Sequence, residues 1–345
     1  MRLPSWLGDL VQAEPALRAL GARVPADRLS LAAPADLLAL LDGVLPGARR
    51  LPVAGRGGER AADWRGHDVA VLLTGSFRSA WTAALAQIPR RVGHARDLRR
   101  WLLTDALRPA LERGGVPLGL GRPRRSRLGP RYLPRPFGAT CVELVGLLGV
   151  GVRDPRPRLS FEPAYAQRVL ARLGLDAGED YVVANVGARP GSAKGFPPAS
   201  WVRVLDVLAA SLDAPVVLTS GPGEEEAVRE VARAVRRARV LPCAGPAASL
   251  VELAALLAGA RLVLATDSGP RHLAVAVGAP VASVSGPTDP RHSADQLRRQ
   301  RMLRVEVPCG PCHRERCPLA GAHANRCMHE VDPEDMARLA LELVE

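Results

Sequence analysis

Short apolar runs alternate with longer segments of helical periodicity along most of this chain. In the second half these runs are bounded by turn-forming residues, which is typical of strands buried in a parallel sheet. Strands that alternate with helices predict a doubly wound α/β fold, whose ligands bind outside the carboxyl ends of the strands. The strands expected there are residues 181–185, 215–219, 240–241, 262–265 and 280–285.

The first half follows the same plan up to a break in the pattern. Residues 69–73 predict a buried strand, followed by a polar turn at 74–79 and a helix at 80–87. Residues 150–163 are rich in proline and arginine and lack periodicity, so we expect the domain boundary there. The pattern therefore predicts two α/β domains, residues 1–155 and residues 156–345.

Composition narrows the class of protein. The 345 residues suffice for two domains with their own cores, and a hydrophobic content of 47% agrees with this. Aromatic residues make up only 3%, which leaves little for platforms that stack nucleic-acid bases. The N-terminus carries no apolar signal segment, and no uncharged apolar run reaches the roughly 18 residues of a membrane span. We therefore expect a cytosolic protein whose six cysteines are reduced or metal-bound.

The net charge of +12 is concentrated in the first half. Residues 1–158 contain 26 arginines against 13 acidic residues, whereas residues 159–345 contain 21 basic and 22 acidic residues. The densest clusters are residues 89–101 and the loop at 119–136. Such a basic half favours nucleic acid, an anionic membrane surface or a phosphorylated substrate, although individual arginines are equally consistent with solvated surface.

Lys194 is the only lysine of the chain. It lies in a glycine-rich loop between the expected strand at 181–185 and a helical pattern that begins near Trp201. A strand, a glycine-rich loop and a helix start form an arrangement that binds phosphate through backbone N–H groups and the helix dipole. An ammonium is also a compact charge that arginine does not replace. We expect Lys194 to bind a phosphate group.

Residues 262–290 contain two strands, each followed by a polar loop. The first strand leads into Thr266-Asp267-Ser268-Gly269-Pro270, and the proline suits the first position of a helix. Asp267 or Ser268 could simply cap that helix, which is a common use of these residues. The loop could instead present free N–H groups to an anion.

The order and spacing of six segments carry a family resemblance over almost the whole length. The chain resembles bacterial lipopolysaccharide heptosyltransferases of glycosyltransferase family 9, nearest the heptosyltransferase II type. The segments are residues 4–9, 76–79, 88–93, 191–197, 267–274 and 286–290.

This resemblance implies a GT-B fold, with two Rossmann-like domains that face a cleft. The acceptor is then expected on the N-terminal domain and the nucleotide sugar on the C-terminal domain. Asp9 resembles the carboxylate that deprotonates the acceptor hydroxyl, although a Gly-Asp pair is also a common helix cap. Candidate acceptor-binding residues in the matching segments are Ser76, Arg78, Arg90 and Arg91.

The donor residues follow from the same resemblance. Lys194 resembles a lysine that contacts the donor diphosphate and assists departure of the nucleotide. The loop around the diphosphate and sugar contains Asp267, Ser268, Gly269 and His272. Glu224 matches the carboxylate on the adenosine ribose best, with Glu225 as the alternative.

The activity implied by the resemblance is inverting transfer of heptose from ADP-L-glycero-D-manno-heptose to the lipopolysaccharide inner core, with a heptosyl-Kdo2-lipid A type of acceptor. A lysine and a helix N-terminus can stabilise the departing ADP, so no catalytic cofactor or metal is expected. The enzyme is expected in the cytoplasm, peripherally on the inner membrane. Two alternatives remain: another nucleotide sugar or acceptor within the family, and a basic nucleic-acid binder with a zinc module.

Two further features of the sequence are its cysteines and its short N-terminal segment. Cys309, Cys312, Cys317 and Cys327 could form a structural tetrahedral zinc site, but their spacing fits no standard finger, and reduced cysteines in a loop are ordinary. Cys141 and Cys243 are predicted to be core residues. Only Met-Arg-Leu precedes Pro4, so we expect either a mis-set start site or a clipped first strand, and a clipped strand would weaken the placement of Asp9.

Overall fold

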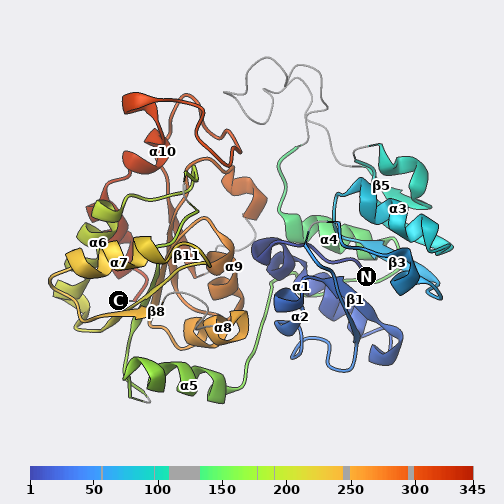
Figure 1. Cartoon of the computed structure of the whole chain (residues 1–345), viewed down its shortest axis with the longest axis horizontal. Helices are drawn as coiled ribbons and strands as arrows, with labels where there is room; N and C mark the ends of the chain where they lie inside the picture. The colour runs from blue at the N-terminus through green and yellow to red at the C-terminus, as the bar shows by residue number, and fades with distance from the viewer. Residues whose placement is uncertain are drawn as a thin grey trace. The chain divides into compact units, whose positions relative to one another are not determined.

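The computed structural model describes residues 1–55, 57–96, 98–108, 133–176, 178–189, 191–243, 249–293 and 299–344. The chain forms two compact units, which Figure 1 shows in blue to green and in green to red. The first unit runs to Ser160 and the second starts at Phe161, apart from a short segment from Arg291 that groups with the first. This division lies five residues beyond the sequence-based boundary at 155. Most of the arginine-rich loop at 119–136 lies outside the described residues.

Parallel strands form the sheet of the first unit. Strand β1 (Ser30–Ala33) pairs with β2 (Arg49–Pro52), and β4 (Arg90–His94) lies between β3 (Val69–Leu72) and β5 (Asp105–Leu107). Arg2 joins the two groups by parallel bridges to Ala32 and Leu72. Its N–H donates to Val71 O at 2.9 Å, and the N–H of Leu3 donates to Ala32 O at 2.9 Å. Residues 1–3 therefore act as the central strand, and the expected short first strand is hydrogen-bonded on both sides.

The helices of the first unit are α1 (Leu7–Gly21), α2 (Ala35–Ala39), α3 (Phe77–Leu85) and α4 (Phe137–Gly146). Helix α1 packs against α4. Helix α3 begins three residues before the predicted start at Ala80, and the hydroxyl of Ser79 in its first turn donates to Ser76 O at 2.9 Å. The polar turn predicted at 74–79 therefore already contains the first helical turn.

The second unit contains a parallel sheet in the order β11-β10-β9-β6-β7-β8. The strands are β6 (Val182–Asn185), β7 (Val216–Thr219), β8 (Val240–Cys243), β9 (Leu262–Thr266), β10 (Val281–Val284) and β11 (Gln300–Leu303). Successive strands extend to one side of β6 as far as β8 and then to the other side from β9. The order therefore reverses between β6 and β9, and such a switch point is where doubly wound sheets bind ligands.

Helices flank this second sheet. They are α5 (Pro163–Leu173), α6 (Pro198–Leu212), α7 (Glu225–Ala234), α8 (Leu250–Ala258), α9 (Gly269–Ala276), α10 (Arg326–His329) and α11 (Pro333–Leu341). The core consists mainly of Val, Leu and Ala, as the low aromatic content predicts. Trp201 of α6 is fully buried and meets Phe196 edge-on, with ring centroids 5.1 Å apart. This contact holds the start of α6, and with it the loop that carries Lys194, against the sheet.

Candidate active site

Lys194 bridges the two strands at the switch point of the second unit. Its loop leaves β6 and leads into α6, and its Nζ donates to the backbone oxygen of Asp267, directly after β9, at 2.8 Å. The same Nζ lies 3.9 Å from Asp267 Oδ2. The lysine side chain is 41% exposed, so its charge remains accessible from solvent. The loop thus presents the ammonium at the position where this class of sheet binds ligands.

Asp267 is the centre of a buried polar network. Its Oδ1 lies 2.8 Å from a guanidinium nitrogen of Arg271, a residue with no exposed surface. Arg271 also donates to Gln300 Oε1 at 2.9 Å and to His272 Nε2 at 2.8 Å. Burial raises the pKa of Asp267, but the charges of Arg271 and Lys194 outweigh it and hold that pKa below its ordinary value. The carboxylate therefore stays ionised and fixes the loop.

Neither residue predicted as a possible cap of α9 performs that role. Ser268 occupies the N-cap position, but its side chain makes no capping hydrogen bond and instead donates to Thr266 O at 3.2 Å. The carboxylate of Asp267 is held by Arg271. Gly269 and Pro270 form the first turn, so the positive end of α9 is not capped by the side chain of its own N-cap residue.

Glu224 faces the loop after β6, which distinguishes it from Glu225. It occupies the N-cap position of α7, and its Oε2 accepts from the N–H of Gly221 at 3.0 Å. A Cβ placed on Gly187 would lie 2.3 Å from the same oxygen, so the carboxylate lies directly against that glycine. Glu225 instead accepts from the N–H of Gly223 at 2.9 Å, a bond that lowers its pKa. The geometry favours Glu224 for contact with a ligand at the switch point.

The cysteine-rich segment, residues 309–329, contacts two of the loops at this edge. The N–H of Ala193, beside Lys194, donates to Glu315 O at 2.8 Å, and the N–H of His313 donates to Pro287 O at 2.8 Å. A Cβ on Gly286 would lie 2.8 Å from the Sγ of Cys327, so the glycine is required by this close packing. Sequence reasoning considered this segment only as a metal site and missed its bracing role. The signal in the sequence was that the two loops this segment contacts, 191–197 and 286–290, keep the order and spacing of the family.

The predicted zinc site is not found among the described residues. The four thiols are near enough to interact, since burial and then Cys312, Cys309 and Cys317 raise the pKa of Cys327 to about 11. Within the described ranges, however, no group of three or more His, Cys, Asp or Glu side chains is arranged to hold a metal. The spacing of the four cysteines along the loop does not determine whether their side chains converge on one point. Metal binding at these four cysteines, which the sequence allowed beside the ordinary alternative of reduced thiols, stays a prediction.

The two other cysteines differ in what the structure describes. Cys141 of α4 is buried, as predicted, and its pKa is raised by burial and then by the charge of Asp9. The side chain of Cys243 lies outside the described part of the chain.

Asp9 belongs to the first turn of α1 rather than to its cap. The helix begins at Leu7, and Trp6 occupies the N-cap position. Asp9 is half-buried, and its effect on the thiol pKa of Cys141 places its carboxylate near α4. Residues 1–3 precede it as a strand paired with β1 and β3. The carboxylate therefore lies just beyond the carboxyl end of that strand, where a doubly wound sheet presents its functional groups.

The loop between β3 and α3 is held by a buried arginine. Arg99 has no exposed surface and donates to Thr74 O at 2.6 Å, to Ser76 O at 3.0 Å and to His94 O at 2.7 Å. Ser76 is exposed, and the side chain of Arg78 is 63% exposed. Both predicted acceptor residues therefore lie on the surface at the carboxyl end of β3.

Arg90 and Arg91 are not brought to that loop. They begin β4, which runs parallel to β3 with Val69 opposite Arg90, so they lie at the amino ends of the strands. Arg90 donates to Asp105 at 2.9 Å and to Leu147 O at 2.9 Å. Arg91 donates to the backbone oxygens of Leu102 and Ile88. These arginines have structural partners at the opposite edge of the sheet.

Other basic residues occupy the carboxyl end of β4 instead. His94 ends this strand, and burial followed by the charges of Arg99, Arg96 and Arg135 lowers its pKa to about 4. The imidazole is therefore neutral near pH 7 beside three guanidinium groups. The basic cluster at 89–101 was treated as one unit in the sequence. A predicted strand at 90–94 would have shown that its two ends lie at opposite edges of the sheet.

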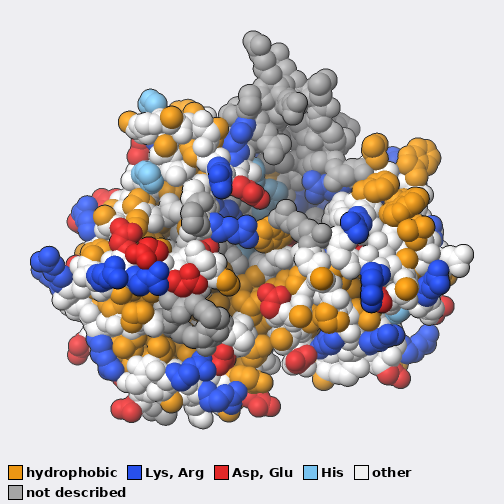
Figure 2. Space-filling model, viewed as in Figure 1, with side chains coloured by type: hydrophobic (Ala, Val, Ile, Leu, Met, Phe, Trp, Pro, Cys, Tyr) orange, Lys and Arg blue, Asp and Glu red, His pale blue; other side chains and the backbone are white. Residues whose placement is uncertain are grey.

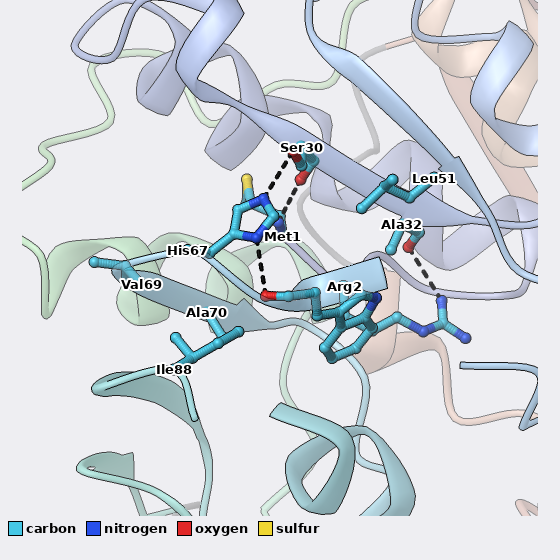
Figure 3. A pocket seen from close by; sticks show the side chains of 10 residues that line it. Met1, Arg2, Ser30, Ala32, Leu51, His67, Val69, Ala70 and Ile88 are labelled. Carbon is cyan, nitrogen blue, oxygen red and sulfur yellow. Dashed lines mark hydrogen bonds between the residues drawn. The ribbon is translucent and has the colours of Figure 1, made fainter. Parts of the chain in front are cut away.

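A small pocket lies at the opposite edge of the first unit (Figure 3). His67 crosses it, with Nε2 at 2.9 Å from Ser30 Oγ and Nδ1 at 3.0 Å from Trp64 O. Val69 and Ile88, at the amino ends of β3 and β4, line the wall. None of the candidate site residues lines this pocket, so it is separate from the carboxyl edge.

Comparisons with known proteins agree with the two-unit parallel architecture. The family model of glycosyltransferase family 9 (heptosyltransferase) matches residues 141–323, which is more than half of the chain. Lipopolysaccharide heptosyltransferase 2 of Salmonella typhimurium is 25% identical over 318 residues, covering 88% of this chain and 86% of that protein.

Solved structures show the same fold over nearly the whole chain. The structure of E. coli ADP-heptose lipopolysaccharide heptosyltransferase II superimposes with a TM-score of 0.71 and 23% identity, covering 99% of this chain and 97% of that one. A glycosyltransferase of family 9 from Veillonella parvula gives a TM-score of 0.75 at 19% identity, with coverages of 99% and 95%. The chain therefore belongs to glycosyltransferase family 9 and is a glycosyltransferase with a GT-B fold.

Proposed function

We propose that this glycosyltransferase transfers heptose from ADP-heptose to the inner core of lipopolysaccharide. Binding of the ADP-heptose donor is supported by one observation. Lys194, Asp267 and the uncapped start of α9 converge at the switch point of the second sheet. An ammonium and a helix N-terminus together offer two sources of positive charge to a diphosphate. Glu224, on the next strand's loop, is suited to accept hydroxyl hydrogen bonds from a ribose.

The proposed reaction is a direct displacement with inversion. The carboxylate of Asp9 removes the proton of the acceptor hydroxyl as that oxygen attacks the anomeric carbon of the heptose. The bond from this carbon to the ADP oxygen breaks, and the electron pair leaves with the diphosphate. Lys194 and the first turn of α9 stabilise the additional negative charge. This division of roles requires no metal ion.

For the acceptor we propose a heptosyl-Kdo2-lipid A type of glycolipid at the cytoplasmic face of the inner membrane. The curated relative from Salmonella typhimurium is named lipopolysaccharide heptosyltransferase 2, which supports a lipid-linked acceptor. Ser76 and Arg78 are exposed at the carboxyl edge of the first unit and are available to bind it. The concentration of positive charge in the first half suits an acceptor that carries phosphate and carboxylate groups. None of the described helices is long and apolar enough to cross a membrane.

A donor panel tests the proposal. The protein is mixed separately with ADP-heptose, ADP-glucose and a series of UDP-sugars, and the shift of its melting temperature is measured. We expect the largest shift with ADP-heptose and formation of a heptosylated product from a deacylated core acceptor. A larger shift with another nucleotide sugar would instead favour the alternative within the family, a different donor.

A further inference from the structure

An exposed apolar stripe runs along α3 in the first unit. Phe77, Trp81 and Leu85 are spaced four residues apart, so they share one face of the helix, and they are 46%, 48% and 51% exposed. The rings of Phe77 and Trp81 stack with centroids 6.4 Å apart. Figure 2 shows hydrophobic side chains gathered over the place of α3 in Figure 1.

The neighbouring turn η3 (Arg99–Leu102) enlarges this apolar surface. It packs against α3 and carries Trp101, which is 88% exposed. Leu98, immediately before it, is 84% exposed and has a φ of 61°, a conformation that is unfavourable for leucine. We call Phe77, Trp81, Leu85, Leu98 and Trp101 the apolar ridge. A large exposed patch of this kind is informative, whereas single exposed leucines are not.

The use of aromatic residues makes the ridge unlike the rest of the chain. The sequence has only nine Trp and Phe residues, and three of them lie on this ridge. In the second unit, by contrast, Trp201 and Phe196 are buried in the core. A chain that builds its cores from Val, Leu and Ala therefore places three of its scarce aromatic rings in solvent on this ridge. Trp is enriched at the membrane–water interface, and Trp, Phe and Leu form the apolar face of helices that lie in that interface.

Charge indicates which partner covers the ridge. Helix α3 and turn η3 contain Arg78, Arg99 and Arg100 and no acidic residue. Arg78 and Arg100 are exposed, as is Arg96 just before the turn. The acidic residues beside them are Asp97, which follows Arg96 in the sequence, and the buried Glu59, 4.0 Å from Arg78. Exposed arginines beside aromatic residues match a surface of anionic phospholipid, where each basic side chain near the surface adds to binding. The N-cap position of α3 is occupied by Ser76, the exposed residue that we assign to acceptor binding.

We propose that the apolar ridge docks the enzyme on an anionic phospholipid bilayer, with its rings inserted among the headgroups and its arginines on the lipid phosphates. This inference rests on the proposed function, since a lipid-linked acceptor must be met at a bilayer. The ridge holds the carboxyl end of β3 at the membrane surface, where the sugar part of the acceptor is presented.

Vesicle flotation tests the docking without using enzyme activity. The full chain is incubated with vesicles of phosphatidylglycerol and phosphatidylethanolamine, or with vesicles of phosphatidylcholine alone. We compare the wild type with Trp81→Ser/Leu85→Ser and with Trp101→Ser. The matched control is Leu319→Ser, at a 40% exposed position of the second unit. We expect the ridge variants to lose about tenfold or more in partitioning to anionic vesicles, while the control matches the wild type.

Three results would overturn the docking proposal. These are equal binding of all variants, no preference of the wild type for anionic vesicles, and loss of self-association in the ridge variants by sedimentation, which would assign the ridge to a second copy of the chain. Turnover of a deacylated, water-soluble acceptor is measured in parallel and should be unchanged in the ridge variants. Failure of that turnover in the wild type would refute the proposed function and leave the flotation result standing.

Discussion

The two units share a parallel α/β architecture but differ in how firmly they hold their candidate residues. In the second unit, the loops after β6 and β9 are tied together by Lys194 and by the buried pair of Asp267 and Arg271. In the first unit, the candidate residues Asp9, Ser76 and Arg78 are exposed or half-buried. The second unit thus holds its charges in fixed positions, whereas the first presents its groups on a basic surface.

This difference has a physical meaning for catalysis. Fixed charges stabilise a leaving diphosphate most effectively, because they do not need to reorganise during the reaction. An acceptor that remains part of a membrane requires instead an accessible edge and long-range attraction. If this comparison is correct, substitutions in the first unit should affect proton transfer and docking, and substitutions in the second should affect donor binding.

The largest expected effect is that of Asp9→Asn on turnover. Asparagine retains the size of the side chain but cannot take the acceptor proton, so kcat should fall by roughly 10² to 10⁴. Donor affinity, measured by calorimetry with ADP, should stay near the wild-type value. The matched control is Asp36→Asn, because Asp36 is likewise an acidic residue in the first turn of a helix, α2. Wild-type turnover in the Asp9 variant would remove Asp9 from the mechanism.

Substitution of Lys194 should weaken donor binding, whereas substitution of Asp9 should slow proton transfer. Lys194→Ala removes a charged phosphate contact, and we expect a loss of about 1.5 to 3 kcal/mol in ADP binding. Lys194→Arg should fail as well, because the wide guanidinium cannot place its charge where the ammonium contacts Asp267 O. Calorimetric titration with ADP measures both variants. Arg203→Ala, which removes only a surface pair with Glu334, is the control.

Restoration of ADP binding by arginine would show that the site requires charge alone. The unique lysine would then reflect composition rather than the shape of the loop.

A smaller effect concerns stability and pH in the first unit. The pKa of His94 is lowered to about 4 by burial and by neighbouring arginines, whereas an unfolded histidine titrates near 6.5. Between these values the unfolded chain binds the proton and the native chain does not, so stability falls as the pH falls. The loss from pH 7 to pH 5 should be roughly 2 kcal/mol.

Urea unfolding at the two pH values measures this contribution. His94→Asn should reduce the pH dependence by about that amount, while His329→Asn, at an exposed position of α10, should retain the wild-type profile. An unchanged profile in the His94 variant would mean that the basic edge of the first unit does not act on this imidazole.

Particular residues show how far the sequence could predict the structure. The strands of the second sheet followed from their apolar runs, and the loops with Lys194 and Asp267 followed from motif order, since β–loop–α units place such loops at the carboxyl edge. The place of Arg90 and Arg91 at the start of β4 could not be predicted, because a basic cluster does not reveal where a strand begins within it, and their role in acceptor binding stays a prediction. Strand β11 and the bracing contact of Glu315 depend on pairing between distant segments, which local patterns do not encode.

The smallest expected effect is that of metal removal, and it separates the donor loops from the segment that braces them. If Lys194 and the start of α9 neutralise the departing diphosphate, turnover should be unchanged within about twofold after treatment with EDTA. The cysteine-rich segment supports both the loop of Lys194 and the loop at Gly286. A metal held there would therefore affect activity through stability and slowly, as the brace loosens. Immediate loss of turnover on chelation, restored by magnesium, would contradict the donor mechanism, whereas a slow fall in melting temperature with unchanged initial rates would assign a metal to the brace alone.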